Sequence, residues 1–170
     1  MVSIAEPAPT RINPLAPNTF ERVLAIGATL LLVAVIVALA KGYSEWGRVP
    51  WQVWPHLLTI MLATALTPVM LLRRRGDRPH RLLGTIWVIS MIATAALSFN
   101  LRLINHGGLS LIHILSAWTL IQAPVIWWSA RTHRVTMHRR SVRYMVLGAL
   151  LVAGFFTFPF NRLMGHWLFG

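Results

Sequence analysis

Residues 111–140 read LIHILSAWTLIQAPVIWWSARTHRVTMHRR, and residues 56–81 follow the same plan, HLLTIMLATALTPVMLLRRRGDRPHR. Each stretch begins with a histidine at the head of an apolar run, holds one proline toward the end of that run, and passes through a basic loop to a His-Arg pair. The first and last histidines are 24 positions apart in one copy (56 to 80) and 25 in the other (113 to 138). We interpret the two stretches as a tandem duplication of a two-helix unit with a histidine at the start of each helix.

The composition indicates an integral membrane protein whose first partner is the lipid bilayer. Of 170 residues, 56% are hydrophobic and 12% are charged, and the charges lie between long apolar runs. The net charge of +12 does not indicate nucleic acid, because the arginines sit in short loops rather than on one basic face. The chain has no cysteine, which excludes disulfides, thiol chemistry and a covalently attached c-type haem.

The apolar runs predict an all-α fold of five transmembrane helices. Residues 1–18, with four prolines, form a flexible cytoplasmic tail, and residues 19–170 form a single membrane domain. The first span covers about residues 22–41 and is expected to be peripheral, facing lipid. Spans two to five are expected at about 54–72, 82–101, 109–129 and 144–160, with a turn at Asn105–Gly108 between spans three and four. Repeat one (about 54–101) and repeat two (about 109–164) would form a duplicated four-helix bundle.

The distribution of basic residues predicts the orientation. Twelve arginines fall on one side of these spans, whereas Lys41, Arg48, Arg102 and Arg162 fall on the other. Positive charge is retained in the cytoplasm, so the amino terminus is expected there and the carboxyl terminus outside, in the inner membrane of a bacterium. The twelve are Arg11, Arg22, Arg73, Arg74, Arg75, Arg78, Arg81, Arg131, Arg134, Arg139, Arg140 and Arg143.

Four histidines are then paired by depth. His56 and His113 lie near the outer ends of spans two and four, and His80 and His138 near the inner ends of spans three and five. Two imidazoles at one depth on facing helices can ligate a haem iron from both faces, so the pattern predicts two haems b. Small and hydroxyl residues at helical spacing from the histidines leave room for a macrocycle.

Other interpretations stay open. Close-packed helices without a ligand use the same small residues, and a His-Arg pair at a membrane rim can also bind lipid phosphate. His106, His133 and His166 are expected to face solvent or headgroups. The acids Glu6, Glu21, Glu45 and Asp77 all fall outside the predicted spans, which disfavours proton-coupled transport. We find no nucleophile, base and orienter for hydrolysis, whereas a transition metal on the histidines is compatible with imidazole chemistry.

Three segments carry a family resemblance: HRLLGTIWVISMIATAALSF, IHILSAWTLIQAPVIWWSAR and HRRSVRYMVLGALLVAGFFTFPFNR. Over about residues 53–164 the chain resembles the bacterial multipass proteins grouped as domain-of-unknown-function family 2306, which implies a membrane protein and no particular activity. The arrangement is also similar to the ascorbate-dependent transmembrane dihaem cytochromes b. That similarity implies one haem shared by spans two and four and another by spans three and five. Here the inner histidines are expected at the rim of the spans, unlike in those cytochromes, and their substrate-binding residues are not identifiable.

The predicted function is therefore a b-type dihaem electron-transfer protein that moves electrons between a quinol or other donor and an acceptor, with a quinone or a redox protein as partner. The main alternative is a haem-free structural or accessory membrane protein, and a third is a metal or haem carrier.

Overall fold

The structure is a computed structural model that describes residues 16–100 and 111–170. The described residues form α1 (Thr19–Lys41), the 3₁₀ helix η1 (Tyr43–Arg48), α2 (Val53–Leu72), α3 (Arg78–Asn100), α4 (Leu111–Arg131), α5 (Val135–Met145), the π-helical η3 (Val146–Val152), α6 (Ala153–Phe155) and α7 (Leu163–Phe169). Because α5, η3 and α6 follow one another without a gap, they make one continuous rod over residues 135–155. The all-α prediction is confirmed for the part of the chain described.

Most helix bounds agree with the sequence prediction, and the fifth does not. α2, α3 and α4 each begin or end within a few residues of the predicted spans. The fifth helix was expected from about residue 144, but it begins at Val135, so His138 lies in its first turn rather than in a loop. It also ends at Phe155 instead of residue 160, and the short helix α7, which was not predicted, follows. The turn expected at Asn105–Gly108 and most of the tail lie outside the described residues.

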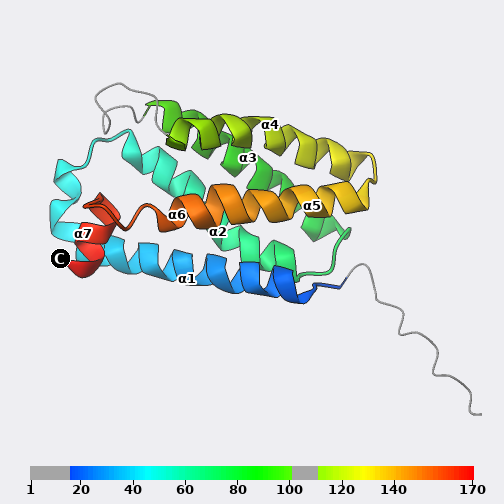
Figure 1. Cartoon of the computed structure of the whole chain (residues 1–170), viewed down its shortest axis with the longest axis horizontal. Helices are drawn as coiled ribbons and strands as arrows, with labels where there is room; N and C mark the ends of the chain where they lie inside the picture. The colour runs from blue at the N-terminus through cyan, green and yellow to red at the C-terminus, as the bar shows by residue number, and fades with distance from the viewer. Residues whose placement is uncertain (1–15, 101–110) are drawn as a thin grey trace, which may run out of the picture.

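The long helices form a closed ring. Neighbours in sequence pack on one another from α1 through α2, α3 and α4 to α5, and α1 closes the ring by packing against η3 (Figure 1). The expectation that the first span is peripheral is therefore wrong: Leu24, Ala25 and Ala28 of α1 belong to the buried core. Small side chains on that face let α1 approach the rest of the bundle closely. Each predicted repeat corresponds to one helical hairpin, α2–α3 and α4–α5, while the duplication itself stays a prediction.

Exposed apolar side chains cover the outside of the ring. Ile26 and Leu30 of α1, Leu58 of α2, Ile89 of α3 and Ile121 of α4 are each more than half exposed. A surface of this kind suits contact with a lipid bilayer. Within the described residues, three helices are long and apolar enough to cross a membrane: Thr19–Lys41, Val53–Leu72 and Arg78–Phe99.

The basic chain segments meet at one end of the ring. The start of α1, the α2–α3 loop and the α4–α5 turn all lie there, while η1 and α7 lie at the opposite end (Figure 1). We call the first the arginine-rich end. It brings together most of the arginines that the sequence analysis assigned to the cytoplasmic side.

Candidate functional site

A cavity of about 360 Å³ opens at the arginine-rich end, between α1, α2, α3, α4 and α5. Its walls are mainly apolar, with Leu71, Val88 and Ile126 from three different helices. Thr67 and Trp87 are fixed in the wall by a hydrogen bond from the indole Nε1–H to the threonine Oγ1, at 2.9 Å. The volume falls within the range of small-molecule and cofactor sites, about 300–1,000 Å³. Its polar lining residues include Glu21, Arg75, His80, Arg81, Arg131, His138 and Arg139.

His80 enters this cavity from the first turn of α3. Asp77, just before the helix, accepts a hydrogen bond from the backbone N–H of His80 at 2.7 Å, which satisfies an otherwise free amide and fixes that turn. This hydrogen bond, together with Arg73, holds the pKa of the Asp77 carboxyl below its usual value. The imidazole Nδ1 of His80 is buried and has no hydrogen-bond partner among the described residues. A buried polar atom in this state is costly, and a ligand in the cavity would relieve the cost.

His138 reaches the same cavity from the first turn of α5. Its Nδ1 lies 3.1 Å from the carbonyl oxygen of Ile126 on α4. A carbonyl only accepts, so Nδ1 carries the proton and Nε2 keeps its lone pair. Metal-ligating histidines are commonly oriented in this way by a backbone carbonyl. The two inner histidines, far apart in sequence, thus line one cavity from the first turns of α3 and α5.

The outer pair is arranged differently. His56 of α2 lies 3.2 Å through Nδ1 from the carbonyl oxygen of Thr94, and Ser98 Oγ lies 3.3 Å from the same nitrogen. His113 of α4 is 5% exposed and packs its ring against Phe99, with centroids 5.7 Å apart. Both histidines therefore pack near the end of α3, at Ser98 and Phe99. The described cavity lies at the opposite end and includes neither of them.

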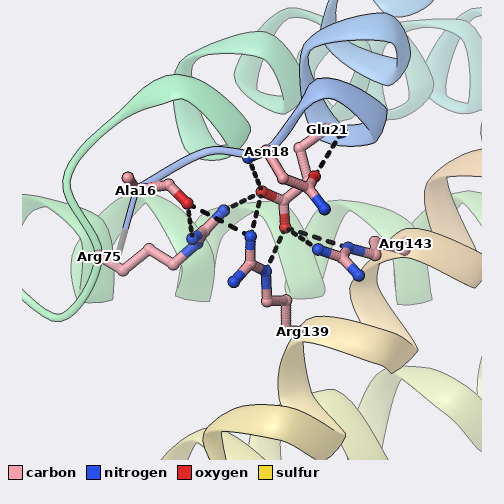
Figure 2. A network of polar contacts seen from close by, with 6 residues as sticks. All are labelled: Ala16, Asn18, Glu21, Arg75, Arg139 and Arg143. Carbon is pink, nitrogen blue, oxygen red and sulfur yellow. Dashed lines mark hydrogen bonds and ion pairs between the residues drawn. The ribbon is translucent and has the colours of Figure 1, made fainter. Parts of the chain in front are cut away.

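A second polar feature borders the cavity: the carboxylate of Glu21, which is only 1% exposed. Arg139 binds it with two hydrogen bonds, Nε to Oε1 at 2.6 Å and Nη2 to Oε2 at 2.9 Å. Arg143 donates to Oε1 at 3.1 Å, and Arg75 forms an ion pair with Oε2 (Figure 2). The cluster joins α1, the α2–α3 loop and α5. One carboxylate thus binds three guanidiniums beside the cavity.

Local sequence explains how Glu21 is placed. Asn18 and Glu21 form a capping box: the Glu21 N–H donates to Asn18 Oδ1, and the Asn18 N–H donates to Glu21 Oε2, both at 3.0 Å. The helix therefore starts at Thr19 and includes Glu21, which the sequence analysis had left outside the first span. The Asn-x-x-Glu spacing was the available signal for this start. Its three arginine partners come from distant segments and carry no such signal.

The predicted haem can be tested for fit against these residues. At the inner pair, the imidazoles of His80 and His138 share one cavity; the first has an unpaired Nδ1 and the second is oriented by a carbonyl. Gly84 and Thr67 are small residues of the cavity wall. The inner pair therefore offers two imidazoles to one cavity, as a bis-histidine cofactor requires. At the outer pair, His56 is oriented as a ligand would be, but no common cavity with His113 is described. Among the described residues no group of three or more His, Cys, Asp and Glu side chains could hold a bare metal ion.

No family model, no curated protein and no solved structure matches this chain. The resemblances named from the sequence therefore stay predictions.

Proposed function

We propose that this chain is a membrane protein that binds haem b through His80 and His138 and transfers electrons through it. The observation that carries the proposal is the shared cavity, which holds both imidazoles from the first turns of α3 and α5. The His138 ring is oriented by the hydrogen bond between its Nδ1 and the carbonyl oxygen of Ile126. The buried Nδ1 of His80 has no hydrogen-bond partner among the described residues. Two imidazoles suffice for a six-coordinate haem, whereas a bare metal ion needs a larger set of donors.

The bound haem would supply a one-electron couple, and the protein residues would set its environment. His80 and His138 would hold the haem. Apolar walls such as Val88 and Ile126 would exclude water from the haem. His56 and His113 are the proposed ligands of a second haem at the outer end, where the carbonyl oxygen of Thr94 orients the His56 ring. Electrons would then pass between a quinol or other donor and an acceptor on opposite sides of an inner membrane.

The test is optical. Protein expressed with ample haem and purified in mild detergent is expected to carry non-covalent haem with the reduced spectrum of a bis-histidine iron. His80→Ala and His138→Ala should each abolish the inner haem, and His113→Ala the outer one, while the exposed His133→Ala should change nothing. Normal yield without any Soret absorbance, in wild type and in all ligand variants, would instead favour the haem-free accessory protein.

A further inference from the structure

Four of the arginines around the α4–α5 turn and the start of α5 are divided between two environments. Arg139 and Arg143, one helical turn apart on α5, both point to Glu21. Arg134 and Arg140 instead stack on aromatic rings. The Arg134 guanidinium carbon lies 4.4 Å from the ring centroid of Trp128, and that of Arg140 lies 5.5 Å from the ring centroid of Tyr144. The first pair of arginines is structural, and the second pair needs another explanation.

No acid of the described chain pairs with the stacked arginines. Glu21 is occupied by three other guanidiniums, and Asp77 is paired with Arg73. Glu45 accepts a hydrogen bond from Trp167 at the opposite end of the ring. Within residues 16–100 and 111–170, Arg134 and Arg140 are thus two exposed cations without an anion.

Stacking prepares these guanidiniums for phosphate. A guanidinium that lies with its face on a ring has its N–H edge directed outward, and that planar edge matches two oxygens of a phosphate. The ring also restricts the long arginine side chain before any ligand binds, which lowers the entropy lost on binding.

The surroundings place this surface at the depth of lipid headgroups. Trp128 is 46% exposed and Tyr144 is 52% exposed. Exposed aromatic rings next to exposed arginines are typical of the boundary between acyl chains and headgroups.

We propose that Arg134, held over Trp128, and Arg140, held over Tyr144, make this surface a binding surface for the phosphate headgroups of anionic phospholipids. The surface combines positive charge that no described acid pairs with and exposed aromatic rings, so it is complementary to a negatively charged headgroup attached to acyl chains. This site is separate from the cavity and does not depend on haem. The arginines at this end would thus select anionic over neutral lipids, in addition to setting the orientation of the protein in the membrane.

The test titrates the purified full-length protein in mild detergent with phosphatidylglycerol or phosphatidylcholine and counts bound lipids by native mass spectrometry. Wild type is expected to bind phosphatidylglycerol more tightly. Arg134→Gln/Arg140→Gln should weaken that binding on the order of tenfold, given two interfacial arginines. The matched control Arg48→Gln/Arg162→Gln removes the same charge at the opposite end and should leave it unchanged. Both double variants should keep the thermal midpoint of the lipid-free protein.

A further pair of variants examines the stacking. Trp128→Ala should lower phosphatidylglycerol binding because Arg134 loses its support, and Trp128→Phe should retain most of it. Equal binding of the two lipids by wild type would overturn the proposal. So would equal losses in the two arginine double variants, or full competition by inorganic phosphate at the same concentration, because the site would then lack preference for a lipid.

Discussion

Glu21 is the residue on which the arginine-rich end depends. A carboxylate with 1% exposure has lost its hydration, and three guanidiniums and one backbone N–H replace that water. Its loss would also remove the carboxylate that Arg75, Arg139 and Arg143 share. Removal of one partner of a buried ion pair is costly for this reason.

We therefore expect Glu21→Gln to lower the free energy of unfolding by about 3–5 kcal/mol, the range for a buried pair broken on one side. Denaturant titration in detergent would measure it. Arg22→Gln, at an exposed neighbouring position without an ion pair, is the control and should change stability by less than about 0.5 kcal/mol. If Glu21→Gln behaves like Arg22→Gln, the cluster does not hold α1 to the ring.

At the residue scale the sequence predicted some features and missed others. The four histidines stood out because a repeated position and a common depth single them out, and the structure brings His80 and His138 to one cavity. Glu21 did not stand out, because a residue next to a predicted boundary was assumed to meet water. The missing information was tertiary: its partners Arg75, Arg139 and Arg143 lie 54 or more residues away.

At the element scale, α7 shows how a short helix is held. The indole N–H of Trp167 donates to Glu45 Oε2 at 3.0 Å, and Lys41 Nζ donates to the Leu168 carbonyl at 2.6 Å. α7 thereby covers the end of α1. Gly165 permits the chain to fold back, since a Cβ there would lie only 1.7 Å from the backbone oxygen of Phe158.

Gly165→Ala is accordingly expected to displace α7 and to destabilise the protein by about 1–3 kcal/mol, through overpacking against backbone that cannot yield. Gly47→Ala is the matched control, because a Cβ at Gly47 meets nothing within 4 Å. Hydrogen exchange of the Leu163–Phe169 amides would report the change, with faster exchange in Gly165→Ala alone. Equal protection in both variants would contradict the observed packing.

The helix bounds illustrate what a hydropathy pattern predicts and what it cannot. α2 and α3 follow their apolar runs closely, because lipid-facing and core-facing residues are both apolar there. The start of α5 was placed about nine residues too late, because its first turns are rich in arginine and look like a loop. Those turns are helical since their charges have partners: Glu21 for Arg139 and Arg143, and Tyr144 for Arg140. α7 has too few residues to form a recognisable pattern.

For the whole molecule, the open question is how many of the five long rods cross the membrane. Three meet the length and composition of a span. The other two, α4 and the rod over residues 135–155, are of similar length and pack in the same ring. α4 also carries strongly exposed apolar residues along its length, with Ile114 at 68% and Ile121 at 67%. Exposure of such large apolar side chains to water is unfavourable, whereas lipid accommodates them. We therefore propose that all five rods cross the membrane.

The absence of cysteine allows a test on the full-length chain. Arg74→Cys, Thr132→Cys and Phe169→Cys place single thiols at exposed positions in the α2–α3 loop, the α4–α5 turn and α7. With five crossings and a cytoplasmic amino terminus, a membrane-impermeant thiol reagent should label only Phe169→Cys in intact cells, and the other two after permeabilisation. Arginine-rich loops resist export, which is why the first two thiols are expected inside.

With three crossings, α4 and α5 would stay outside, and Thr132→Cys would be labelled in intact cells together with Phe169→Cys. Labelling of Arg74→Cys and Thr132→Cys alone in intact cells would keep the five crossings and reverse the orientation, so the three thiols separate the competing topologies in a single experiment.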